Sequence, residues 1–203
     1  MSDKTVMKQR IETIKQKLKQ ARDRKLKCFG SEAHKFNSQL VPKSAVEGFE
    51  STYSITLPEE YRAFLLEVGI GAGPYYGLQK LGVGWVCDDE TEEGEKTWLS
   101  SPCLIEPLMC EGVGHTGWDD ALEKQGHPWE RHYQGIMEIV SQGCTYLSGL
   151  VVTGPYRGHI LGLDMDRQTP HFDNSSFLGW YETWLDNVLA GEKYPSCKAK
   201  PKE

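Results

Sequence analysis

The segment that most constrains this chain is residues 57–78, in which a short helical pattern runs directly into a glycine-rich turn. Pro58 fits the first turn of a helix, because its missing N–H would have no partner there anyway. Four apolar residues then recur at helical spacing: Tyr61, Phe64, Leu65 and Val68. Gly69 tolerates the left-handed backbone that commonly ends a helix. We therefore predict a short helix that ends at Gly69, followed by a tight turn that closes on Pro74 and Tyr75.

Gly69, Gly71 and Gly73 look like the start of a dinucleotide-binding motif, but their context differs from it. That motif follows a strand and opens a helix, so that the helix N-terminus meets a phosphate. Here the glycines follow a helix, and Pro74 hinders a new helix in the turn. We therefore predict no phosphate site at this turn.

The length and composition indicate one folded domain. A chain of 203 residues can bury a substantial core without disulfides or metals. The first ten residues lack the apolar stretch of a secretory signal, and no apolar run approaches the length of a membrane span. We therefore expect a cytoplasmic protein, in which the six scattered cysteines are free thiols.

The charge of the chain is unevenly distributed. Residues 1–27 contain ten Lys or Arg and three Asp or Glu, a net charge of +7, and residues 193–203 carry +3. Because the whole chain carries −6, residues 28–192 carry −16. Such a body repels nucleic acid and attracts basic partners. We expect a basic protein partner, and neither nucleic acid nor a membrane.

A basic amphipathic helix is predicted over residues 3–25. Its apolar side chains form a narrow seam: Met7, Ile11, Ile14, Leu18 and Ala21. The simplest interpretation is a helix that lies on the domain with a solvated basic face. A coiled-coil seam and a docking arm are the alternatives.

The middle of the chain has a less regular pattern. A second helix is expected from Pro42, a strand or extended segment over residues 78–86, and an acidic loop over residues 88–95. Residues 104–135 are rich in Gly and Pro, with a short helix expected around residues 119–124. A region this long with little periodicity indicates a functional insertion or a poorly ordered excursion.

The last third predicts strands and one aromatic helix. The predicted strands cover residues 136–140, 145–153 and 159–163. The connection between the last two is short, which implies an antiparallel pair. A final helix, capped by a residue among 174–176 and ended by Gly191, has these apolar positions: Phe177, Trp180, Tyr181, Trp184, Leu185, Val188 and Leu189. Aromatic rings on one helical stripe indicate core packing rather than a ligand cage.

Four further blocks follow the first segment in order: Gln142-Gly143-Cys144, Leu150-Val151-Val152, Gly154-Pro155-Tyr156-Arg157-Gly158 and residues 177–185. Together with residues 57–78, they resemble the SUKH superfamily, specifically its Smi/Knr branch of yeast cell-wall assembly regulator-like proteins. The resemblance runs from about Pro42 to Gly191. It implies an α+β fold, with helices on one face of a central, mostly antiparallel sheet. It also implies binding rather than catalysis, since many bacterial members are immunity proteins against toxins and others are cell-wall regulators or adaptors.

These observations divide the chain into three predicted parts. Residues 1–27 form the basic helix, residues 28–192 a single SUKH-like α+β domain, and residues 193–203 a basic C-terminal tail.

An acidic run between two tryptophans is the candidate partner-binding site. The run contains Asp88, Asp89, Glu90, Glu92, Glu93 and Glu95. Like charges at this density favour an extended, solvated loop, which is one interpretation. Trp85 and Trp98 flank the run, and a tryptophan beside acids is typical of an interface anchor with a steering rim. The second interpretation therefore assigns all eight residues to a protein interface.

No catalytic residue, cofactor or metal site is predicted. A zinc site could be drawn from Cys87, Cys103, Cys110 and His115, but these residues lack the paired spacing of structural zinc sites. Cys144 could act as a nucleophile with one of three histidines as its base: His132, His159 or His171. Nothing in the sequence indicates an oxyanion hole or an orienting group, so a buried, inert thiol is the expectation for Cys144.

The leading hypothesis is a non-catalytic immunity protein that binds and neutralises a bacterial toxin, for example a nuclease. The alternative is a regulatory or scaffold protein of the same fold that binds an endogenous partner. The basic helix over residues 3–25 favours this alternative, because toxin neutralisation does not obviously need it.

Overall fold

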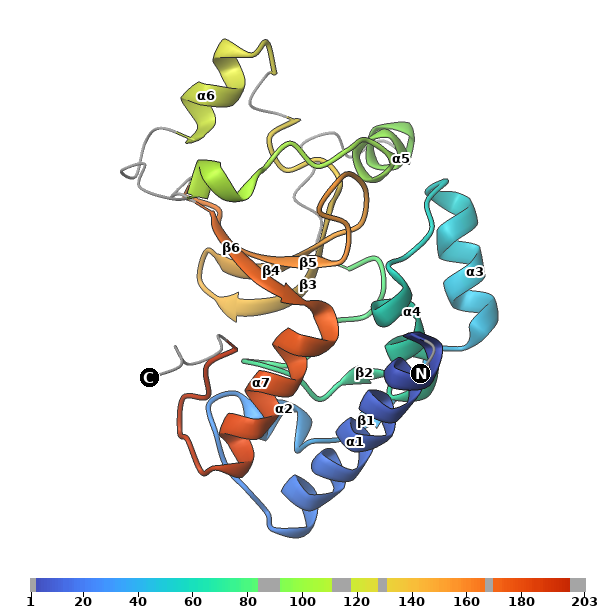
Figure 1. Ribbon diagram of the computed structural model, residues 1–203, viewed down its shortest axis with the longest axis vertical. Coiled ribbons are helices and arrows are strands. Elements are labelled where there is room, and N and C mark those ends of the chain that lie inside the picture. The colour runs from blue at the N-terminus through green and yellow to red at the C-terminus, as the bar shows by residue number, and fades with distance from the viewer. Residues whose placement is uncertain (1–2, 84–91, 111–117, 128–130, 167–169, 198–203) are drawn as a thin grey trace.

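The computed structural model describes residues 3–83, 92–110, 118–127, 131–166 and 170–197. It confirms the α+β class. The centre of the molecule is a four-stranded antiparallel sheet in the order β3-β4-β5-β6 (Figure 1). The strands are β3 Ile136–Gly143, β4 Tyr146–Val151, β5 His159–Asp164 and β6 His171–Ser176. A second, two-stranded antiparallel sheet pairs β1 Ser38–Gln39 with β2 Ile70–Gly71.

Helices lie on both sides of the central sheet in Figure 1. On one side are α1 Asp3–Asp23, α2 Ser31–His34, α4 Glu59–Glu67 and α7 Phe177–Leu189, with α3 Lys43–Thr52 beside α4. Toward the other side are α5 Glu92–Ser100, the 3-10 helix η1 Pro107–Cys110 and α6 Trp118–Lys124. Among the described residues, no helix is long and apolar enough to cross a membrane.

Helix α7 packs its aromatic stripe into the core, as its spacing predicts. Ser176 caps the helix, and its Oγ accepts a hydrogen bond from the Gly179 N–H at 3.5 Å. Phe177, Tyr181 and Trp184 are each 0% exposed. Their rings pack against α4 as well, with the Phe64 and Tyr181 centroids 4.7 Å apart. The prediction of core packing is confirmed.

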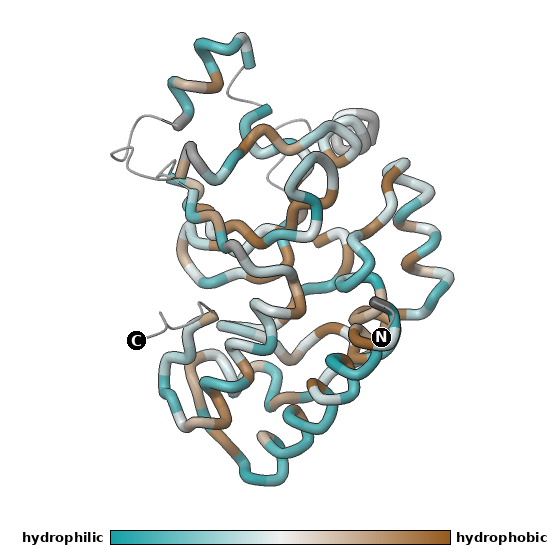
Figure 2. Tube along the Cα trace, viewed as in Figure 1, coloured by the Kyte–Doolittle hydropathy of each residue, from teal (hydrophilic) through white to brown (hydrophobic). Residues whose placement is uncertain are grey.

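Helix α1 lies on α7 and α4, which confirms the simplest of its three interpretations. Ile11, Ile14, Leu18 and Ala21 are at most 2% exposed and belong to the same hydrophobic cluster as the sheet. In Figure 2, the tube of α1 alternates between hydrophilic and hydrophobic residues, as expected for a helix with one face on the core. Residues 3–23 are therefore an integral part of the domain.

Ion pairs explain why α1 is basic. Arg10 lies 2.9 Å from a Glu60 carboxylate oxygen and 2.8 Å from one of Glu182, so one guanidinium joins α1, α4 and α7. Together the two carboxylates outweigh the cost of partial burial and raise the pKa of Arg10. Further along α1, Lys15 pairs with Glu67 and Lys17 with Asp186, and both of these acids belong to the acidic body. Within α1 itself, Lys19 pairs with Asp23.

Three regions differ from the sequence predictions. The acidic run was predicted as a loop, but residues 92–95 form the first turn of α5, where glutamates favour the positive end of the helix dipole. Strand β6 was missed because its residues are mostly polar, without the apolar alternation of a half-buried strand. A strand or extended segment was expected over residues 78–86, but in its described part Leu78 alone forms a β-bridge, with Gly71, and a turn follows at residues 81–82.

Candidate functional site

Four aromatic rings from three distant parts of the chain meet at the surface. Around Phe29, the ring centroids of Tyr75, Tyr76 and Tyr194 lie at 6.3, 5.6 and 5.9 Å. Phe29 is 40% exposed, Tyr76 51% and Tyr194 70%, whereas Tyr75 is half-buried. We call these four residues the aromatic patch.

Close backbone packing holds the patch in place. Gly30 has φ 78°, and a Cβ at this residue would lie 1.6 Å from the Tyr75 carbonyl oxygen, so the connector before α2 rests directly on the glycine-rich turn. On the other side, the Phe29 N–H donates a 2.8 Å hydrogen bond to the Lys193 carbonyl oxygen. The first residues of the C-terminal segment are thereby tied to the same surface.

The composition of the patch is typical of a protein interface. Exposed tyrosine and phenylalanine rings offer large, rigid contact areas, and clustered exposed apolar groups mark interaction surfaces. Lys193 borders it, with its ammonium 5.7 Å from the Tyr194 ring centroid. The sequence did not predict Phe29 and Tyr194 as site residues, because neither belongs to an apolar pattern and Tyr194 lies in the predicted basic tail. A signal existed, namely an aromatic residue in each of two otherwise polar stretches.

A polar groove of about 520 Å³ adjoins the patch at Tyr76. Its lining includes His34, Ser38 and Gln79. Each of these residues has a side-chain polar atom (His34 Nε2, Ser38 Oγ and Gln79 Oε1) that is closed off from water without a hydrogen-bond partner among the described residues. Leaving such an atom unpaired costs about 1–3 kcal/mol. The amide, hydroxyl and imidazole groups of the groove suit hydrogen bonding.

The tautomer of His34 follows from its surroundings. Its Nδ1 accepts a 2.9 Å hydrogen bond from the Phe36 N–H, so the proton of the neutral ring is on Nε2. Burial lowers the pKa of His34 to about 4; the Gly73 carbonyl acts weakly in the opposite direction, without forming a hydrogen bond of ordinary geometry. At neutral pH, His34 is therefore an uncharged donor in the wall of the groove.

Acidification should destabilise the protein through His34. Its ordinary pKa is 6.5 and its folded value about 4, so between these pH values the unfolded chain binds more protons than the folded one. The free energy of unfolding is therefore retained above pH 6.5 and decreases as the pH falls toward 4. The total loss is about 3 kcal/mol, because a difference of one pKa unit corresponds to about 1.4 kcal/mol. Urea unfolding at several pH values measures this slope.

The matched variant for this prediction is His34→Asn, because the asparagine oxygen can still accept from the Phe36 N–H. The variant should show a shallower loss of stability over the same pH range than the wild type. Equal slopes would mean that other groups carry the pH dependence.

Of the eight predicted partner-binding residues, Trp98 is the one whose side chain the structure describes. Trp85, Asp88, Asp89 and Glu90 lie outside the described residues. Glu92, Glu93 and Glu95 belong to α5 rather than to a loop. Trp98 is 7% exposed and packs in the hydrophobic core, because it faces the interior from the last turns of α5. As a surface anchor, Trp98 was predicted wrongly.

Three cysteines named in the catalytic and metal alternatives lie in the described part of the chain, and they are Cys103, Cys110 and Cys144. Cys144 is exposed, with φ 50° in the turn between β3 and β4, so the expectation that it is buried is wrong. Within the described residues, no group of three His, Cys, Asp or Glu side chains could hold a metal ion, although Cys87 and His115 lie outside them. Burial raises the pKa of Cys103 to about 12, the opposite of what a reactive thiol needs.

No protein-family model, no curated protein and no solved structure matches this chain.

Proposed function

We propose that this chain is a non-catalytic binding protein of the immunity type, which neutralises a protein toxin by stoichiometric association in the cytoplasm. The observation that carries the proposal is the aromatic patch, in which Phe29, Tyr76 and Tyr194 expose rings of the kind that dominate protein interfaces. The resemblance of five sequence blocks to the SUKH superfamily supports a toxin as the partner. The charge of −16 on residues 28–192 favours a basic toxin at long range.

The regulatory or scaffold alternative receives no support from α1. The alternative depended on a basic helix available for an endogenous partner. Instead, α1 uses its apolar face for the core and Arg10, Lys15 and Lys17 for ion pairs within the domain. Its basic character therefore has a structural explanation that needs no partner.

The first test is co-expression with the toxin domains encoded beside this gene, with growth as the readout. We expect one neighbouring product to be toxic and this protein to restore growth. If no neighbouring product is toxic, or none is neutralised, the proposed function is wrong.

The second test asks whether the aromatic patch is the binding surface. Loss of an interface hot spot costs at least about 2 kcal/mol, so Phe29→Ala and Tyr76→Ala should each weaken toxin binding about 30-fold or more in titration calorimetry. Val6→Ala is the control, because Val6 is 44% exposed at the opposite end of α1 from the patch. Equal affinities for the patch variants and Val6→Ala would exclude the patch while leaving neutralisation itself intact.

A further inference from the structure

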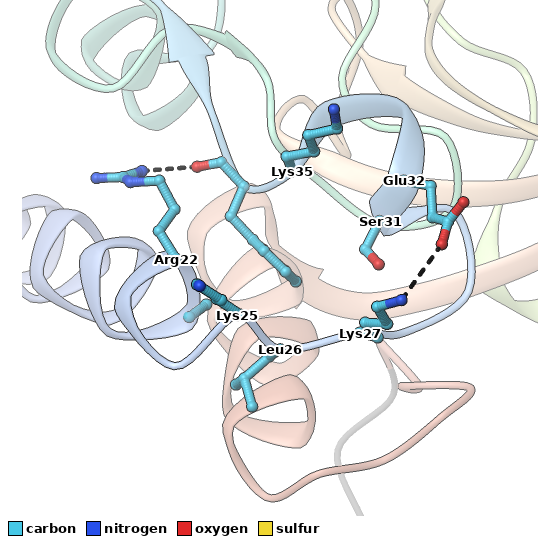
Figure 3. Close-up of a pocket in the computed structure, with 9 residues that line it drawn as sticks. Arg22, Lys25, Leu26, Lys27, Ser31, Glu32 and Lys35 are labelled. Atoms are coloured by element: carbon cyan, nitrogen blue, oxygen red, sulfur yellow. Dashed lines mark hydrogen bonds and ion pairs between the residues drawn. The ribbon is translucent and has the colours of Figure 1, made fainter.

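A second pocket, distinct from the polar groove, lies between the C-terminal end of α1 and helix α2. Its volume is about 600 Å³, within the range of small-molecule sites. Its apolar wall is formed by Ala21, Leu26 and Phe36, of which Ala21 and Phe36 are at most 2% exposed. Figure 3 shows the polar side chains that surround it.

The polar lining is strongly basic although the protein as a whole is acidic. Four cations line the pocket, and they are Arg22, Lys25, Lys27 and Lys35. Glu32 is the single acid among the lining residues, and it lies 3.8 Å from Lys27 in an exposed, weak pair. The net formal charge of the lining is therefore +3.

Two of these cations make no ion pair or side-chain hydrogen bond with the residues that the structure describes. Most basic residues of α1 and its ends are engaged, and Arg22 donates through Nη1 to the Phe36 carbonyl at 2.6 Å. In contrast, neither Lys25 nor Lys35 has an ion pair or a side-chain hydrogen bond within the described part of the chain. Both have left-handed backbone, with φ 50° and 49°, which costs a non-glycine residue about 1–2 kcal/mol. The fold thus holds, at a conformational cost, two ammonium groups beside an apolar wall that have no partner in the described segments.

We propose that this pocket binds a phosphomonoester carried on an aromatic or other apolar body. A phosphomonoester carries a charge of about −1.5 to −2 at neutral pH, which matches several cations better than a single carboxylate does. The ammonium groups of Lys25 and Lys35 point in different directions in Figure 3, and their long side chains turn toward the phosphate oxygens on binding. The body of the ligand packs against Leu26, the half-buried member of the apolar wall. The same chemistry exists in a free nucleotide and in a phosphotyrosine segment of a protein. The inference stands independently of toxin binding.

The test is an NMR titration of the full chain, in low salt and without phosphate buffer, with phenyl phosphate as the probe. We expect saturable shifts at the backbone amides of residues 21–36, and affinity at least about tenfold higher than for inorganic phosphate, because the apolar body adds contact area. Raising the salt concentration should weaken binding, since exposed charges are screened. Absence of saturable shifts in this segment, or equal affinity for inorganic phosphate, would overturn the proposal.

Charge variants test the assigned residues. Lys25→Gln with Lys35→Gln should weaken phenyl phosphate binding at least about tenfold, since each unpaired cation attracts the anion at short range. Lys4→Gln with Lys8→Gln removes the same charge from the opposite end of α1 and should change affinity less than twofold. Equal weakening by both pairs would mean a general effect of net charge and would overturn the assignment. All four lysines are exposed, so folding should be unaffected.

Two further probes distinguish the sources of the ligand. Tighter binding of adenosine monophosphate than of phenyl phosphate identifies a free nucleotide, whereas tighter binding of a phosphotyrosine peptide identifies a protein segment. Either result supports the proposed chemistry. Shifts by these probes that avoid residues 21–36 would contradict it.

Discussion

Replacing Gly69 by alanine should be among the most destabilising single changes in this protein. Gly69 has φ 95°, and a Cβ there would lie 2.0 Å from the Gln39 carbonyl oxygen and 2.7 Å from the Leu40 nitrogen. All of these atoms belong to the backbone, and the β1–β2 pairing holds Gln39 opposite Ile70. Relief of the clash would therefore require separation of the small sheet. We expect a loss of at least about 4 kcal/mol in the free energy of unfolding, measured by urea denaturation.

Gly191→Ala is the matched control for this prediction. Gly191 has a similar φ of 87°, but an added Cβ would meet nothing within 4 Å. This variant should lose only the cost of left-handed backbone, about 1–2 kcal/mol. Similar losses for the two variants would show that the dihedral angle, rather than close backbone packing, explains the glycine.

Replacing Trp184 by alanine should cost about 3–5 kcal/mol, as is typical of a large aromatic residue lost from a core. Trp184 is 0% exposed and joins α7 to the segment around α2. Its ring stacks on Phe36 with centroids 6.2 Å apart, and it makes edge contacts with His34 at 6.1 Å and Tyr181 at 5.2 Å. Denaturation followed by circular dichroism measures the loss.

Trp184→Phe separates packing from hydrogen bonding. The indole Nε1 is buried without a hydrogen-bond partner among the described residues, so phenylalanine removes an unpaired donor while it keeps much of the packed ring. We expect Trp184→Phe to lose less than half of what Trp184→Ala loses. An equal loss for the two variants would mean that the indole nitrogen contributes stability after all.

The parts of the fold with strong local signals were predictable. Helix α7 follows from the apolar residues that recur at helical spacing between Phe177 and Leu189, and α1 follows from its apolar seam. Strands β3, β4 and β5 follow from short apolar runs separated by glycine-containing turns. In contrast, β6 depends on backbone hydrogen bonds to β5, which polar residues such as Asp173 make as readily as apolar ones. Its pairing partner, rather than its composition, determines that it is a strand.

The candidate site was much less predictable than the fold. Trp98 and the acidic run were predicted as a partner-binding site because aromatic and charged residues are adjacent in the sequence, yet Trp98 is buried. The patch around Phe29 combines three segments whose contacts depend on Gly30 resting on Tyr75 and on the hydrogen bond to Lys193. None of these contacts leaves a periodic or spacing signal, because each joins residues far apart in the chain.

For α1, α7 and strands β3 to β5, the sequence by itself determined which segments are helical or extended and which faces are apolar, because these properties depend on propensities and spacing within a few residues. It also determined that α1 is basic and that residues 28–192 are acidic. Only the tertiary structure decided how those charges are used. Folding pairs Arg10, Lys15 and Lys17 with acidic partners on α4 and α7. It leaves Lys25 and Lys35 beside an apolar wall without an ion pair to any residue that the structure describes. The physical reason is that an ion pair depends on distance in space, which local sequence does not encode.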